Sequence, residues 1–178
     1  VPLLYASSSC IHQWHLSPYG ISKKVNEETA QAGQVGLRFT TVYGDGARDT
    51  MFIGKLMRGD LKYATNHIRD FIHVNDVIHA IELIMLKITD THLFPECSLR
   101  PAYDIGTGKG TSVLEVIKAF EKVNNLKLNY KIVDRREGDV MVCYADTTIA
   151  NKELNWKTEI SLEEALKSAW KWQQKQSV

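Results

Sequence analysis

The chain has 178 residues, of which 44% are hydrophobic and 24% are charged, and its formal net charge is +1. These values match those of globular proteins and exclude disordered and fibrous chains. The near-neutral charge favours neither nucleic acid nor an anionic membrane surface as a partner, and no apolar run could span a bilayer. The three cysteines lack CxxC spacing, which is typical of a reducing compartment, and we expect a cytoplasmic protein.

The first elements predicted along the chain are a strand, a helix and a second strand. Leu3–Ala6 is a short apolar run that indicates a buried strand. Ser17 and Pro18 supply a helix cap and a proline at the first helical position, and the helix should reach about residue 32. Val35–Tyr43 is the next strand candidate.

The later part of the chain continues the alternation of helices and strands. Two Ser-x-x-Glu capping boxes, at Ser112 and at Ser161, each predict the start of a helix. The other expected elements are a helix at Met51–Met57, an extended segment at Arg69–Val74 with Asn75 as a helix cap, a strand ending at Ile105 and a strand at Leu128–Val133. This alternation predicts an α/β protein with a mainly parallel sheet.

A tyrosine and a lysine four residues apart form the sharpest local motif. Tyr19 and Lys23 share one face of the predicted helix, so the phenol and the ammonium can point into one pocket. A nearby ammonium favours the phenolate and makes a tyrosine usable as an acid and base. Ser8 or Ser9, at the end of the preceding strand, could add a hydrogen bond to the reacting oxygen.

A glycine-rich segment and the histidines suggest other chemistries. Asp104–Gly110 (DIGTGKG) is similar to the glycine loop that holds S-adenosylmethionine in methyltransferases, and to a dinucleotide-binding loop. It lies too late in the chain for the sheet that either fold builds after it. The six histidines show no zinc-ligand spacing, so no metal site is predicted, and His12 and His15 are expected on a loop surface.

Six segments in chain order resemble one protein family. They read YASSSC, SPYGISK, VGLRFTTVYG, RDFIHVNDV, YDIGTGKGTSVLEVI, and RREGDV followed by YADTTIANKELNW. Together they resemble extended short-chain dehydrogenase/reductases that act on nucleotide sugars, most closely the UDP-sugar 4-epimerases for UDP-glucose and UDP-glucuronate.

The resemblance implies a partial Rossmann fold, a doubly wound parallel sheet, followed by a smaller C-terminal α/β substrate-binding domain. Residues 1–48 would belong to the Rossmann domain, to which residues 69–95 would return. Residues 49–178 would form mainly the nucleotide-sugar domain. Family members usually form homodimers through the helix that carries the tyrosine, so a homodimer is expected.

The resemblance also implies the reaction and its catalytic residues. NAD takes a hydride from C4 of the sugar, the 4-keto sugar rotates, and the hydride returns to the other face. Tyr19 would be the acid and base, Lys23 would bind the nicotinamide ribose, and Phe39 would lie near the nicotinamide. The serine would be Ser8 or Ser9; alignment of the strand favours Ser8, and alignment of the serine run favours Ser9.

Five further residues would bind the UDP-sugar by the same resemblance. Thr41 lies near the sugar, and Arg48 would meet a sugar carboxylate unless it is a solvated loop arginine. Arg69 and Arg136 would bind the diphosphate and Asp139 the uridine ribose, which suits the chemistry of each group.

The sequence departs from the family pattern in three places. The loop between the serines and Tyr19 is short and carries His12-Gln13-Trp14, and the chain is again shorter than usual between the helix after Tyr19 and Leu37-Arg38. Related dehydratases carry an acidic pair after the catalytic hydroxyl residue, and Ser-Cys-Ile at residues 9–11 argues against 4,6-dehydration. The glycine turn that binds the NAD pyrophosphate is missing, and the chain starts at Val1 inside a predicted strand, so we expect a fragment. A non-catalytic remnant that binds nucleotide sugar remains the alternative, and a methyltransferase is a third.

Overall fold

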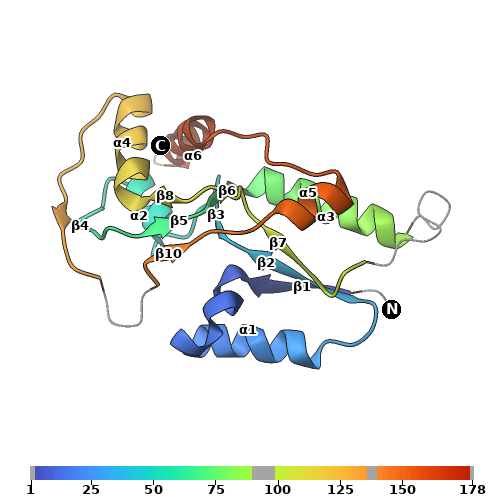
Figure 1. Ribbon diagram of the computed structural model, residues 1–178. Helices are drawn as coiled ribbons and strands as arrows, with labels where there is room; N and C mark the ends of the chain where they lie inside the picture. Colours follow the sequence, from blue (N-terminus) through green and yellow to red (C-terminus); the bar gives the residue numbers. More distant parts are fainter. Residues whose placement is uncertain (1–2, 90–98, 136–139, 177–178) are drawn as a thin grey trace.

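A parallel sheet of three strands forms the centre of one half of the molecule. The computed structural model describes residues 3–89, 99–135 and 140–176 (Figure 1). The strands β1 (Leu3–Ser8), β2 (Gln34–Phe39) and β7 (Ala102–Ile105) pair in the order β1-β2-β7. Ser8, Phe39 and Ile105 lie in register, so the three strands end at one edge of the sheet.

Helices cover both faces of this sheet. The 3₁₀ segment η1 (Ser9–Leu16) and the helix α1 (Pro18–Thr29) lie on one face, whereas α3 (Val74–Thr89) and α5 (Thr148–Leu154) lie on the other (Figure 1). This arrangement confirms the predicted α/β class and the doubly wound parallel sheet.

The other half of the molecule combines short strands with three helices. The strand β3 (Thr41–Tyr43) pairs in parallel with β6 (Phe71–His73). The two remaining strand groups are β10 (Val142–Cys143), β5 (Ile68–Arg69) and β8 (Thr111–Ser112), and β4 (Tyr63–Ala64) with β9 (Lys131–Ile132). The helices are α2 (Phe52–Met57), α4 (Val113–Asn124) and α6 (Leu162–Gln176).

Two hydrophobic cores lie on opposite sides of β6. Phe71 packs into a core built mainly from α2, α4 and α6. Its neighbour Ile72 packs into a second core with residues of β2, β7, α3 and α5. Successive strand residues point to opposite faces, so these two positions divide between the cores.

Three of the four helix caps predicted from local sequence, at Ser17, Ser112 and Ser161, are confirmed. The Ser17 hydroxyl accepts a hydrogen bond from the Gly20 amide at 3.0 Å. The Ser112 and Glu115 side chains form both bonds of a capping box, and Ser161 forms the same box with Glu164.

Several element boundaries differ from the prediction. Val35–Tyr43 is divided at Thr40, whose amide donates to the Ile105 carbonyl, so that the chain leaves one sheet for another. Only Lys131–Ile132 of Leu128–Val133 is a strand, and α1 ends at Thr29. The helix α3 starts at Val74, before Asn75, because the His73 ring accepts a hydrogen bond from the Asn75 amide.

The sheet also bears on the predicted domain division. The strand β7 pairs with β2 although it lies far beyond residue 48, so residues 102–105 share a sheet with residues 3–39. The division itself stays a prediction. Within the described ranges, no helix has the length and apolarity needed to cross a membrane.

Candidate active site

A cavity opens where β1 and β2 end. Its volume is about 200 Å³, and we call it the serine cavity. It is lined by Ser8, Ser9, Cys10, Ser17, Phe39, Thr40, Thr41, Arg69, Val140 and Cys143. Ligands of parallel α/β sheets bind at the carboxyl ends of the strands, so the position is suited to a binding site.

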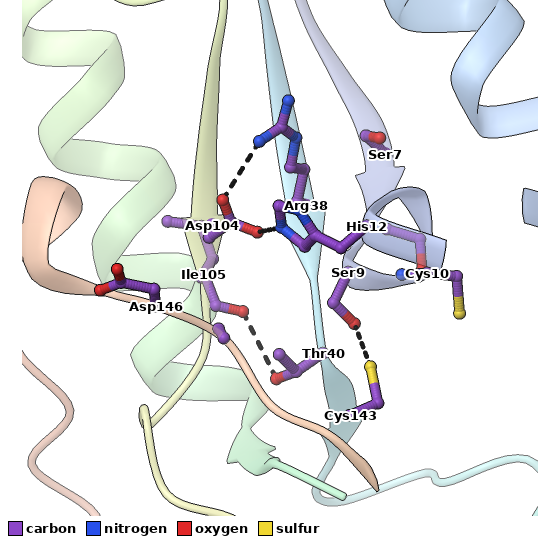
Figure 2. Close-up of polar contacts among 12 residues, drawn as sticks. Ser7, Ser9, Cys10, His12, Arg38, Thr40, Asp104, Ile105, Cys143 and Asp146 are labelled. Atoms are coloured by element: carbon purple, nitrogen blue, oxygen red, sulfur yellow. Dashed lines mark hydrogen bonds and ion pairs between the residues drawn. The ribbon is translucent and has the colours of Figure 1, made fainter. Parts of the chain in front are cut away.

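The two candidate serines are buried but have different partners. The Ser8 hydroxyl accepts a hydrogen bond from the Cys10 amide at 3.2 Å, which caps η1. The Ser9 hydroxyl lies 3.4 Å from the thiol of Cys143, which also lines the cavity (Figure 2). Because both serines line the cavity, the choice between them stays open.

The structure brings Tyr19 and Lys23 together on α1. The Lys23 ammonium lies 5.5 Å from the centroid of the Tyr19 ring and donates to the Ala6 carbonyl oxygen at 2.9 Å. Tyr19 is 53% exposed. Neither side chain belongs to the lining of the serine cavity, but Ser17, which caps this helix, does.

A larger cavity of about 890 Å³ adjoins the serine cavity. Thr41 and Arg69 line both cavities, and Arg69 donates to the carbonyl oxygens of Ile68 and Met141 at 2.8 and 3.3 Å. The rest of the lining is Thr50, Phe52, Lys55, Asp60, Leu61, Lys62, Tyr63, Ala64, Thr65, His67, Phe71, Val113, Val133 and Asp134.

The predicted binding residues divide into three groups. Phe39, Thr41 and Arg69 line the serine cavity. Arg48 is exposed and belongs to neither lining. Arg136 and Asp139 lie outside the described residues.

The glycine-rich segment has a structural partner in Asp70. This fully buried carboxylate accepts hydrogen bonds from the amides of Thr107 and Gly108 at 2.8 and 3.0 Å, and from the amide of Ala145 at 3.3 Å. A Cβ on Gly106 would lie 2.4 Å from an Asp70 oxygen. The loop amides of Thr107 and Gly108 are therefore used inside the protein, which removes the main support for a methyltransferase.

An ion pair that the sequence prediction missed lies beside the serines. His12, expected on a loop surface, places its Nε2 atom 2.6 Å from the Asp104 carboxylate (Figure 2). The hydrogen bond to Asp104 raises the pKa of His12, although burial opposes this shift. No local pattern could predict the pair, because 92 positions separate the two residues.

Metal binding has no support within the described part of the chain. There, no group of three or more His, Cys, Asp or Glu side chains is placed to hold a metal ion.

Comparison with protein families gives two matches that together cover most of the chain. Residues 3–94 match the NAD dependent epimerase/dehydratase family, and residues 50–169 match the GDP-mannose 4,6 dehydratase family model.

Two similar curated proteins are UDP-glucose 4-epimerases. The chain is 43% identical over 125 residues to UDP-glucose 4-epimerase of Pasteurella multocida (strain Pm70), covering 69% of this chain and 36% of that protein. It is 45% identical over 109 residues to UDP-glucose 4-epimerase of Drosophila melanogaster, covering 60% of this chain and 29% of that protein. The matches therefore span about a third of the relatives' length.

Solved structures share the fold over almost the whole chain. UDP-glucose-4-epimerase from Stenotrophomonas maltophila, with bound NAD and formylated UDP-arabinopyranose, matches with a TM-score of 0.82 and 27% identity, over 99% of this chain and 65% of that one. MoeE5 in complex with UDP-glucose and NAD matches with a TM-score of 0.83 and 28% identity, over 100% and 67% of the two chains. With more than half of its residues in the family model, the chain belongs to the NAD dependent epimerase/dehydratase family.

Proposed function

We propose that this chain forms the substrate-binding and proton-transferring part of an NAD-dependent enzyme that epimerises a UDP-sugar at C4. The observation that carries the proposal is the serine cavity, which lies at the carboxyl edge of the sheet and adjoins a larger cavity at Arg69. The names of the curated relatives support the same reaction.

The proposed chemistry assigns proton transfer to Tyr19. In its phenolate form Tyr19 takes the proton of the C4 hydroxyl and becomes the phenol, which later returns that proton, and Lys23 holds positive charge beside the ring. A buried serine hydroxyl, from Ser8 or Ser9, bonds the reacting oxygen and fixes its position. General acid and base catalysis of this kind contributes about 10²–10⁴-fold to a rate.

The residues present fit the nicotinamide end of NAD. Lys23, whose ammonium bonds the Ala6 carbonyl oxygen, is the proposed ligand of the ribose, and Phe39, at the end of β2, offers an aromatic wall. When bound, NAD supplies hydride removal and return at C4. The Gly106–Gly110 loop would not hold the pyrophosphate, because its Thr107 and Gly108 amides already donate hydrogen bonds to Asp70.

The large cavity is proposed for the nucleotide. Arg69 lies between the two cavities, where a diphosphate would link a uridine in the larger one to a sugar in the smaller one. Lys55 and Lys62 add positive charge to the lining, and Tyr63, 62% exposed, offers a ring against which a base can stack. Arg136 and Asp139 remain proposed ligands of the diphosphate and ribose.

Epimerisation is preferred over dehydration on one sequence feature. The GDP-mannose 4,6 dehydratase model matches residues 50–169, which do not include the serines or Tyr19. The residues after the serines are Cys10 and Ile11, without the acidic pair of the dehydratases. A non-catalytic protein that binds nucleotide sugar is the second candidate, since the large cavity needs no NAD.

The nucleotide site is tested by calorimetric titration of the 178-residue chain with UDP. Arg69→Gln should weaken UDP binding about tenfold or more, because a charge-assisted bond to phosphate is lost. Arg48→Gln, outside both cavities, is the matched control and should leave UDP binding unchanged. A wild-type chain that binds no UDP, or equal affinities for all three proteins, would contradict the nucleotide site.

The reaction is tested in a protein that joins this chain to the family's glycine-turn segment. A coupled assay with UDP-glucose and UDP-glucuronate measures turnover of wild type, Tyr19→Phe and Lys23→Ala. Both variants should lose about 10²-fold or more in kcat. Turnover equal to that of wild type would exclude the Tyr19–Lys23 mechanism, and UDP binding without turnover in wild type would favour the non-catalytic protein.

We also propose a homodimer through α1. Ile21 and Val25 lie one turn apart on its outer side and are 45% and 48% exposed. An Ile21→Glu variant should be monomeric in light scattering where wild type is dimeric, and a monomeric wild type would exclude the dimer.

A further inference from the structure

The segment η1 connects the two parts of the candidate site. It follows Ser8 directly, contributes Ser9 and Cys10 to the wall of the serine cavity, and ends one residue before Ser17 caps α1. The geometry of η1 therefore sets where the serines stand relative to Tyr19.

One side chain of η1 bonds to the sheet in the middle of this segment. The His12 ring is 52% exposed, but its Nε2 atom lies 2.6 Å from Asp104, whose side chain is only 15% exposed (Figure 2). Asp104 lies in β7, one residue before the strand ends at Ile105. The bond thus joins the middle of η1 to the carboxyl edge of the sheet.

The same carboxylate belongs to a larger network that also reaches α1. Arg38 donates to Asp104 at 3.2 Å and to the two oxygens of Glu27 at 2.6 and 2.9 Å. Glu27, on α1, also accepts a hydrogen bond from Ser7 at 2.5 Å. Ser7, Arg38 and Asp104 lie in register on β1, β2 and β7, so η1 and α1 are both bonded to one row of the sheet.

The charge of this network explains why His12 belongs in it. The charged groups that face His12 are Asp104 of β7, Arg38 of β2 and Glu27 of α1. Two carboxylates and one guanidinium carry a net charge of −1, which a proton on His12 neutralises. Arg38 and Glu27 side chains are only 24% and 12% exposed, so water screens their part of the network little.

We propose that His12 is a positioning residue: by bonding Asp104 it holds η1, and with it Ser9 and Cys10, at the wall of the serine cavity. This inference rests on the proposed function, in which the sugar occupies that cavity. Loss of the bond should weaken binding of the sugar and leave binding of the nucleotide unchanged, because no residue of η1 lines the large cavity.

The test compares UDP with UDP-glucose as titrants of the 178-residue chain. In His12→Gln and Asp104→Asn the ratio of UDP-glucose affinity to UDP affinity should fall about threefold at about pH 6, where the ion pair is charged. At about pH 9 the difference from wild type should shrink, because neutral histidine makes a weaker bond. Glu28→Gln, which removes the exposed Lys24–Glu28 pair of α1, is the matched control and should keep the wild-type ratio.

Hydrogen exchange of the amides of residues 9–16 separates this inference from the nucleotide site. At about pH 6 these amides should exchange faster in both variants than in wild type, while the amides of α4 stay protected. If the wild-type chain binds neither UDP nor UDP-glucose, the proposed function is refuted. Hydrogen exchange then still shows whether the His12–Asp104 bond holds η1. Unchanged exchange in residues 9–16, or equal loss of UDP and UDP-glucose affinity, overturns the positioning role.

If Asp104→Asn also loses the bond from Arg38 and the variant fails to fold, His12→Gln still decides the inference. That substitution alters only the half-exposed end of the network.

Discussion

Asp70 is a fully buried carboxylate whose hydrogen-bond donors come from two separate segments of the chain. Amides of Thr107, Gly108 and Ala145 and the hydroxyl of Thr107 donate to its oxygens. Four donors around one carboxylate offset the cost of removing its charge from water. Its neighbour Arg69 lines both cavities, so the same bonds hold the wall of the candidate site.

Replacing Asp70 by asparagine should therefore destabilise the protein strongly. In Asp70→Asn the side-chain NH₂ group replaces one carboxylate oxygen and faces backbone N–H groups, which cannot accept a hydrogen bond from it. The expected loss in the free energy of unfolding is about 3 kcal/mol. Urea unfolding monitored by circular dichroism measures it. Asp45→Asn, on an exposed turn, is the control and should cost less than about 0.5 kcal/mol. A cost for Asp70→Asn as small as that of the control would contradict the bonding described.

His12 should make the stability depend on pH. Its pKa is raised in the folded protein, chiefly by the bond to Asp104, above the ordinary value of about 6.5. Its contribution is therefore fully present below that ordinary value and is lost as the pH rises through the folded pKa. Urea unfolding of wild type and His12→Gln should differ more at about pH 6 than at about pH 9. A difference that grows with pH would show that the sign is wrong.

Sequence reasoning reached some of these residues and not others, for a physical reason. The pair of Tyr19 and Lys23 follows from helical spacing, and both lie on one helix face as predicted. The partner of His12 lies 92 positions away, and the partner of the Gly106 loop, Asp70, lies 37 positions away from Thr107. Pairing of β2 with both β1 and β7, and of β3 with β6, brings such groups together, and no local pattern encodes these pairings.

At the scale of elements, η1 and α1 pack through a glycine. A Cβ on Gly20 would lie 2.6 Å from the Trp14 carbonyl oxygen and 2.8 Å from the Trp14 Cα atom. Both atoms belong to the backbone, so no rotation of a side chain could make room. The close approach keeps the segment with the serines against the helix that carries Tyr19.

Gly20→Ala tests this packing, because two effects oppose each other. Alanine gains about 1 kcal/mol of helix propensity over glycine, whereas overpacking against backbone costs about 1–3 kcal/mol or more. We expect the clash to prevail and the melting temperature to fall. Ser22→Ala, on the exposed side of the same helix, should leave the melting temperature unchanged or raise it. A more stable Gly20→Ala variant would mean that η1 does not lie this close.

Elements with local signals were predictable, and those without them were not. The caps at Ser17, Ser112 and Ser161 need only their own next three residues, and all three form. The strands β4, β5, β8, β9 and β10 have two residues each, too few for any alternation of polar and apolar side chains. Each of these strands forms only where a partner strand lies beside it. Leu128–Val133 has the apolar content of a strand, but only Lys131 and Ile132 pair with a neighbouring strand.

At the scale of the whole molecule, the pair β3 and β6 separates the two hydrophobic cores. Phe71 belongs to one and Ile72 to the other, so the strand that carries them is shared by both halves. The domain division near residue 48 stays a prediction, and a strand that contributes to both cores does not mark its position.

Ile72→Ala should destabilise the molecule as a whole. The side chain is fully buried, and truncation to alanine at such sites costs about 2–5 kcal/mol. Ile132→Ala is the same change at a position that is 65% exposed and should cost less than about 0.5 kcal/mol. In Ile72→Ala, hydrogen exchange should rise in α3 and α4 together. Protection lost in α3 alone would show that the two cores unfold independently.

The bonds of Asp70 also determine an order in which the chain can fold during synthesis. The strands β1 and β2 and the helix between them lie within residues 3–39 and can associate early. Asp70 is made next, but its partners Thr107 and Ala145 follow 37 and 75 positions later. Until those residues have left the ribosome, the carboxylate must stay hydrated, and the wall of the site around Arg69 cannot close. A nascent chain stopped before residue 145 should therefore be captured by proteases and chaperones at the segment that carries Asp70.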